Sequence, residues 1–107
     1  MGYIEIKVID FTSTPGTRYR SEGPFSGEEY RETIIEPAFL EAIKNNSIVK
    51  LNLDGPFGYG TSFLEEVFGG LARNYGAEKV LKAFTFISKE EPYLIEDIAQ
   101  YVKDTEK

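Results

Sequence analysis

The chain has 107 residues, and its 18 acidic and 12 basic side chains give a formal charge of −6. This length fits one compact domain spanning residues 1–107, and the acidic balance disfavours binding to nucleic-acid phosphates. The sequence has no His and no Cys, which excludes imidazole catalysis, thiol nucleophiles, disulfides and the usual zinc ligands. We therefore expect a recognition function, with no cofactor and no metal.

The N-terminal residues alternate charge with apolar side chains, so we expect no signal peptide. No run approaches the roughly 20 apolar residues that a membrane helix requires, which predicts no membrane association. The sequence therefore indicates a cytoplasmic protein.

The first predicted element is a strand over residues 3–9, where apolar and polar side chains alternate. Residues 11–27 follow as a long loop with dense Pro and Gly, and we expect a short strand through residues 18–20 inside it. Loops of this length are commonly functional or mobile. Ser26 is expected to cap a helix that continues toward Lys44, with a kink or a break at Pro37.

A second strand is predicted over residues 48–54, and glycines interrupt the chain over residues 55–60. Ser62 and Glu65 have the spacing of a capping box, so a helix is expected from Ser62 to about residue 75. A helical turn over residues 77–82, a strand over residues 84–87 and a last helix opening at Glu90-Glu91-Pro92 complete the order. This alternation predicts an α/β fold, with a mostly parallel or mixed sheet of about four strands flanked by three to four helices.

The loop over residues 55–62 carries the most information about function, because anions and nucleotides bind where a strand leads into a helix. Its spacing resembles a phosphate-binding loop, but Thr61 stands where the motif needs Lys. The dinucleotide fingerprint fails at Phe63, and a serine-hydrolase elbow would lack a His to activate Ser62. The sequence therefore favours a non-enzymatic role for this loop.

Ser62 and Thr61 are hydroxyl side chains at the predicted helix start, and two interpretations remain open. Ser62 can simply cap the helix, or an exposed hydroxyl can accept a phosphate that changes a docking surface by nearly two charges. Phe57 and Tyr59 are expected either to cover the end of the sheet or to anchor a partner protein.

Gly69-Gly70 lies inside the predicted helix, where each glycine costs about 1 kcal/mol relative to Ala. Either close packing of the helix on the sheet or a partner lying against Phe68 and Leu71 would explain this cost.

Arg18 and Arg20 form a basic spot in an acidic chain. Alternate residues of a strand point to one face, so both guanidinium groups can bind one anion, or can pair with Asp54 or a helix carboxylate. The acidic pairs along the helices are best explained as solvated faces and partners of the helix dipole.

Three runs carry a family resemblance: PGTRYRSEGPFSGEEYR over residues 15–31, VKLNLDG over residues 49–55, and GYGTSFLEEVFGGL over residues 58–71. With these runs the chain resembles, over roughly residues 3–88, the prokaryotic STAS-like domain family of unknown function, which is related to anti-sigma factor antagonists. The resemblance implies a small sheet flanked by helices, with a strand, loop and helix forming a signalling surface. In the wider superfamily a Ser or Thr at this helix start is phosphorylated by a histidine-kinase-like ATPase acting as serine kinase. The antagonists carry an Asp-Ser-Ser-Gly type signature here, whereas this chain has Gly60-Thr61-Ser62-Phe63.

The leading hypothesis is a signalling module that binds such an ATPase or kinase through residues 55–71 and is switched at Ser62 or Thr61. The residues expected to bind the partner are Phe57, Tyr59, Gly60, Phe63, Glu66 and Gly70. The alternative is a small nucleotide- or anion-binding domain that uses Arg18, Arg20 and the helix start at Ser62. Self-association is left open by the sequence.

Overall fold

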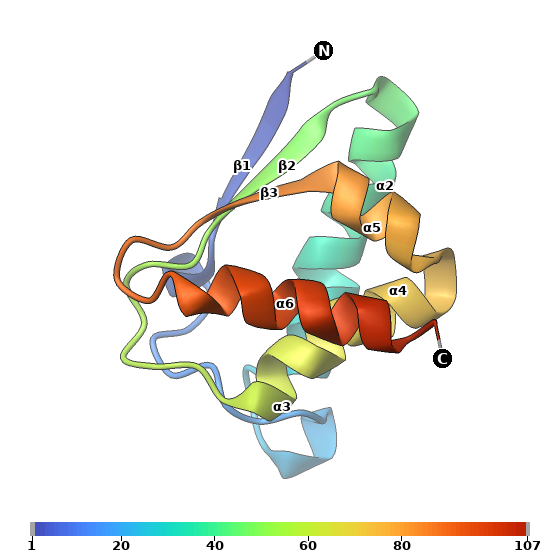
Figure 1. Cartoon of the computed structure of the whole chain (residues 1–107). Helices are drawn as coiled ribbons and strands as arrows, with labels where there is room; N and C mark the ends of the chain where they lie inside the picture. Colours follow the sequence, from blue (N-terminus) through green and yellow to red (C-terminus); the bar gives the residue numbers. More distant parts are fainter. Residues whose placement is uncertain (1, 107) are drawn as a thin grey trace.

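Three parallel strands form the sheet of the computed structural model, which describes residues 2–106 (Figure 1). They are β1 (Tyr3–Lys7), β2 (Ile48–Asn52) and β3 (Phe84–Ile87), in the order β1-β2-β3. Ile4 lies beside Val49, and Val49 lies beside Phe84. The predicted α/β class and parallel pairing are confirmed, but the sheet has three strands instead of about four. The strand expected over residues 18–20 is absent, because that segment bonds to side chains and to the following helix.

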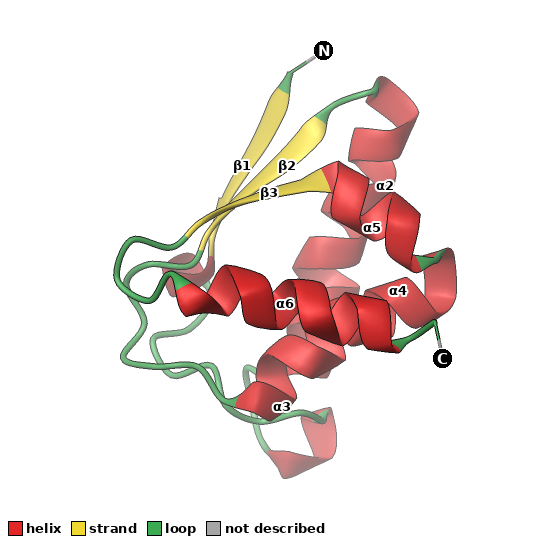
Figure 2. Ribbon diagram, in the orientation of Figure 1, coloured by secondary structure: helices red, strands yellow, loops and turns green. Residues whose placement is uncertain are grey.

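Within residues 2–106 four helical segments pack against the sheet, and two of them contain a π turn (Figure 2). The first is continuous through α1 (Gly27–Tyr30), the π turn η3 (Arg31–Ile35) and α2 (Glu36–Asn45). The second is continuous through α3 (Thr61–Leu64), the π turn η4 (Glu65–Gly69) and α4 (Gly70–Tyr75). The others are α5 (Ala77–Ala83) and α6 (Tyr93–Asp104), and short 3₁₀ turns occupy η1 (Val8–Asp10) and η2 (Arg20–Glu22).

Pro37 does not divide the first helix at its own position. Ser26 caps this helix as predicted, accepting a hydrogen bond from the Glu29 N–H at 3.1 Å. The irregularity lies one turn before Pro37, where the Glu36 N–H bonds to the Arg31 carbonyl across a π turn. Proline has no N–H that could donate a hydrogen bond to the preceding turn. The helix therefore widens into a π turn before Pro37 and continues with Pro37 in the first turn of α2.

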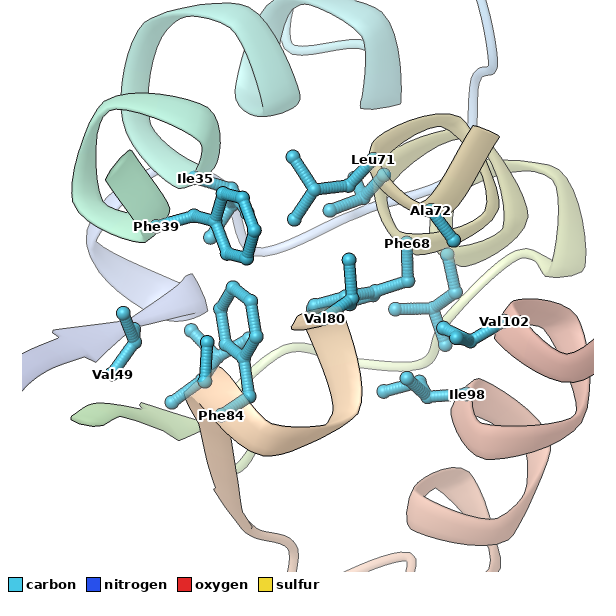
Figure 3. Packing of buried hydrophobic residues seen from close by; sticks show 14 of the residues in the cluster. Ile35, Phe39, Val49, Phe68, Leu71, Ala72, Val80, Phe84, Ile98 and Val102 are labelled. Atoms are coloured by element: carbon cyan, nitrogen blue, oxygen red, sulfur yellow. The ribbon is translucent and has the colours of Figure 1, made fainter. Parts of the chain in front are cut away.

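The helices lie on one side of the sheet, and the core fills the space between them (Figure 1). Val49, Leu51 and Leu53 are buried, whereas the alternating Lys50 and Asn52 are only half-buried, as the period-two pattern predicts. Phe39, Phe68 and Phe84 meet in this core (Figure 3), with Phe84 stacked on Phe39 at 6.2 Å and edge-on to Phe68 at 5.4 Å. The opposite face of the sheet carries the exposed side chains of Tyr3, Glu5, Lys7 and Thr85.

The last helix, α6, follows Pro92 and buries one apolar stripe of Leu94, Ile98 and Val102. It packs on the second helix around η4, which completes the layer of helices. None of the helices within residues 2–106 has the length and apolar character to cross a membrane.

Candidate functional site

Three loops meet where the parallel strands end, which is the edge at which open α/β sheets usually bind ligands and partners. The Asp54 carboxylate, just after β2, accepts hydrogen bonds from the N–H groups of Lys89 and Glu90 after β3 at 3.2 and 3.0 Å. In return Glu90 accepts a bond from the Gly55 N–H at 2.8 Å. These reciprocal bonds fix the start of the loop over residues 55–60.

The segment after β1 supports the same loop from its other side. The Phe57 N–H donates to the Ser13 carbonyl at 2.9 Å, and the Gly60 N–H donates to the Pro15 carbonyl at 2.8 Å. A Cβ at Gly60 would lie 2.9 Å from the Gly16 carbonyl oxygen, so only glycine permits this approach of two backbones. The role of Gly60 is therefore to join two loops.

Phe57 and Tyr59, left open by the sequence, have different environments. Phe57 is 89% exposed, the largest exposed fraction among the exposed large apolar side chains. Tyr59 is half-buried and donates a 2.6 Å hydrogen bond from its hydroxyl to the Leu53 carbonyl. Burial raises the pKa of Tyr59 well above its usual range, so the hydroxyl stays protonated as this donor. Phe57 is thus accessible to other molecules, whereas Tyr59 covers the end of the sheet.

Thr61 and Ser62 are both exposed, and neither of them caps the helix. Gly60 occupies the N-cap position with extended backbone, and its carbonyl accepts the first helical bonds from Phe63 and Leu64. The N-cap therefore lies two residues before the Ser62 position that the capping-box spacing predicts, and the capping interpretation of Ser62 is wrong. Both hydroxyls are exposed at the end of the helix where the dipole favours negative charge.

Three residues expected to touch a partner are buried instead. Phe63 is 1% exposed and Glu66 is 7% exposed, and Gly70 is also buried. Phe63 packs between the rings of Tyr30 and Tyr59. The helical period of apolar residues locates the face that packs on the core, but it does not show which other residues a neighbouring helix covers. The sequence therefore overestimated the accessible surface of this helix.

Glu66 is buried because two arginines from elsewhere in the chain pair with it. Arg31 donates to Glu66 at 3.0 Å, and Arg18 lies 3.4 Å from it. Arg18 also donates to Glu65, which accepts a further bond from Arg73 at 2.7 Å. Burial of Glu65 opposes its ionisation, but the hydrogen bonds from Arg73 and Arg18 outweigh burial and lower its pKa.

We call this set of side chains the arginine–glutamate cluster: Arg18, Arg31, Glu65, Glu66 and Arg73. It ties the 11–27 loop and the first helix to the second helix. Sequence reasoning found Arg18 but missed Arg31 and Arg73, because a pairing between residues far apart in the chain leaves no local pattern. The only sequence signal for the cluster was the Gly69-Gly70 pair, which leaves room beside the second helix for large side chains.

Arg20 does not join Arg18, contrary to the expectation of a shared strand face. Its guanidinium pairs with Glu32 at 2.9 Å on the surface, and its backbone begins the 3₁₀ turn η2. Both arginines therefore pair with helix carboxylates, one of the predicted outcomes, and neither pairs with Asp54 in the structure. Anion binding by Arg18 and Arg20 would require these carboxylates to be displaced.

Gly69-Gly70 is explained by the arginine–glutamate cluster. A Cβ at Gly70 would lie 2.7 Å from Arg31 Nε, and a Cβ at Gly69 would overlap the carboxylate of Glu65. The missing side chains let Arg31 and Glu65 lie flat against the second helix. Packing on the sheet is therefore not the reason for these glycines, and Phe68 and Leu71 are fully buried, so they offer no groove to a partner.

The fold and this site define a small α/β module in which a hydrogen-bonded loop and a helix start lie at the carboxyl edge of the sheet. The chain belongs to the family described as a STAS-like domain of unknown function, whose model matches residues 26–94. This match confirms the family resemblance and covers the first helix, β2, the 55–62 loop, the second helix and β3. No curated protein matches the chain, and no solved structure matches it.

Proposed function

We propose that the chain is a non-enzymatic regulatory module that binds a partner protein through residues 55–62. The observation that carries the proposal is Phe57, which is 89% exposed on a loop whose backbone is fixed at both ends. An exposed aromatic on a preorganised loop contributes contact area without a large ordering cost, which is typical of binding hot spots.

The partner is proposed to be an ATPase of the histidine-kinase-like class, as the STAS-like family relationship implies. Ser62, which aligns best with the acceptor of the antagonists, is the preferred phosphate acceptor, and Thr61 is the second candidate; both hydroxyls are exposed. A phosphate there would add nearly two negative charges within five residues of Phe57 and would change the fit of a partner. The proposed contact surface is thus the loop and first helical turn, without the buried Phe63, Glu66 and Gly70.

Binding is tested with the product of a neighbouring ATPase gene by calorimetry. Phe57→Ser is expected to weaken binding at least tenfold, because it removes the anchor ring. Leu40→Ser is the matched control, since Leu40 is an exposed apolar side chain, 45% exposed, on α2. Equal affinity of wild type and Phe57→Ser would contradict the proposed surface.

Phosphorylation is tested separately by incubating the pair with ATP and locating the phosphate by mass spectrometry. We expect incorporation that Ser62→Ala removes or, if Thr61 is the acceptor, that Thr61→Ala removes. Ser62→Asp or Thr61→Asp should then weaken the complex. If neither substitution to Asp alters binding and no phosphate is incorporated, the loop binds without a switch.

A further inference from the structure

The outer edge of β1 is a second surface, separate from the 55–62 loop. Among residues 2–106, β1 pairs only with β2, so it is an edge strand of the sheet (Figure 2). The Gly2 carbonyl accepts a bond from the Ile48 N–H at 3.0 Å, so even-numbered residues direct their backbone groups toward β2. Tyr3, Glu5 and Lys7 therefore direct their N–H and C=O groups outward, where another strand can pair with them.

The side of this edge that faces the helices is apolar. Ile4 and Ile6 remain half-buried although they point toward the core, because no further strand covers them. Beside them lies a recess of about 230 Å³, whose wall includes Ile6, Phe11 and Ile34. Ile34 is 38% exposed. An added strand would cover this apolar strip with its own inward-facing side chains.

The opposite side of the edge carries alternating charges. Glu5 and Lys7 are both exposed on the open face of the sheet, and Glu5 lies beside Lys50 in the β1–β2 register. A strand that placed a cation opposite Glu5 and an anion opposite Lys7 would continue this alternation. The chain supplies such a segment itself, because residues 5–7 of β1 are complementary to their own reversed copy.

We infer that two copies of the chain associate through antiparallel pairing of their β1 strands, with Glu5 of each copy opposite Lys7 of the other. In this register residues 5 and 7 exchange the backbone bonds and the two Ile6 side chains meet beside the recesses. The register shifted by two residues would place the two Glu5 carboxylates opposite each other, and like charges directly opposite destabilise a pair. Glu5–Lys7 complementarity thus selects both the occupant and the register.

Charge reversal tests this interface by sedimentation velocity across a range of protein concentrations. Wild type is expected to dimerise, and Glu5→Lys or Lys7→Glu alone should weaken dimerisation about tenfold or more, since each creates two repulsive pairs. The double variant Glu5→Lys/Lys7→Glu should regain dimerisation. An equimolar mixture of the two single variants should form a mixed dimer, because one copy then offers two cations and the other two anions.

The exposed Glu78–Lys82 pair on α5, separated by 2.8 Å, provides the matched control. Exchanging these two charges leaves β1 untouched and should leave the association constant unchanged. Glu5→Pro is a further variant, because it removes an outward N–H without removing a bond to β2, and circular dichroism checks its folding. It should remain monomeric.

Three results would overturn the inference: a wild type that stays monomeric at every concentration, single reversals that do not weaken the dimer, or a double variant that does not recover. A monomeric wild type would leave this edge to an extended segment of another protein. None of these results depends on Phe57, Thr61 or Ser62, so the proposed partner binding stands or fails separately.

Discussion

The 55–60 loop and the helix that follows it are adjacent in the chain, and in each of them one side chain has the opposite exposure to the one that its hydropathy predicts. In the loop, an aromatic side chain, Phe57, is 89% exposed. In the helix, a charged side chain, Glu66, is only 7% exposed. The loop can present an apolar anchor because backbone bonds fix it, and the helix can bury a carboxylate because two arginines reach it. The comparison teaches that the accessible surface of this segment ends where the arginine–glutamate cluster begins.

Among the substitutions that test this comparison, Arg31→Met is expected to destabilise the protein most. It would leave the nearly buried Glu66 with Arg18 alone, 3.4 Å away, and should lower the free energy of unfolding by about 3 kcal/mol. Urea denaturation measures this loss. Arg20→Met is the control, because its pair with Glu32 is exposed and contributes at most about 1 kcal/mol. Equal effects of the two substitutions would show that burial of the cluster has no energetic weight.

Adding Glu66→Met to Arg31→Met sharpens the same point. Removing both members of a buried pair avoids an uncompensated charge, so the double variant should be more stable than Arg31→Met alone. If the double variant is less stable than Arg31→Met, the bond between Glu66 and Arg18 stabilises the protein even without Arg31.

Gly70→Ala is expected to have the next largest effect. The new methyl group would lie 2.7 Å from Arg31 Nε and displace it from Glu66, at a cost that exceeds the gain of about 1 kcal/mol in helix propensity. We expect a net loss of about 1–2 kcal/mol in thermal or urea unfolding. Gly69→Ala should be less harmful, because it meets the end of the flexible Glu65 side chain. A stabilising Gly70→Ala would show that Arg31 has another place to lie.

The ionisation of Glu65 should make the stability of the arginine–glutamate cluster depend on pH. Its folded-state pKa lies below the ordinary value of 4.5 because Arg73 and Arg18 outweigh its burial. The stabilisation from these bonds is therefore complete above that pH and is lost as the pH falls through the lowered pKa. Glu65→Gln should cost up to about 1 kcal/mol near neutral pH, with a smaller difference from wild type in acid. A difference that grows on acidification would contradict this assignment.

Phe57→Ser should have the smallest effect on stability, within about 0.5 kcal/mol of wild type, because the ring is almost fully exposed. Thermal unfolding checks this expectation. Tyr59→Phe is the comparison within the same loop: it removes the bond to the Leu53 carbonyl and should cost about 1 kcal/mol. A destabilising Phe57→Ser would mean that the ring serves the fold.

The order of strands and helices could be predicted from the sequence because periodicity is local. The alternation in residues 48–54 and the helical spacing after Ser62 each reflect one buried face, and the structure has a strand and a helix there, although β2 ends at Asn52, two residues before the predicted end. The predicted N-cap was two residues too late because Gly60 is fixed by Pro15, which is distant in sequence. Capping signatures report local preference and do not include such tertiary bonds.

The candidate site was only partly predictable for the same reason. The glycine-rich break before a helix marked the loop, but the sequence left open whether Phe57 and Ser62 are exposed. The burial of Glu66 depends on Arg18, 48 residues away, and on Arg31, 35 residues away. Neither pairing has a local signature, although the adjacent glycines Gly69 and Gly70 marked where a bulky side chain crosses the helix.

The two π turns have a mechanical consequence for the module. Arg31 begins one of them and Glu66 lies inside the other, and the salt bridge between these residues joins the two helices at the point where each is locally widened. Shifting either helix by one residue would separate this pair, so neither helix can slide along the other without breaking it. A displacement of the second helix along the first would therefore have to break this buried salt bridge first.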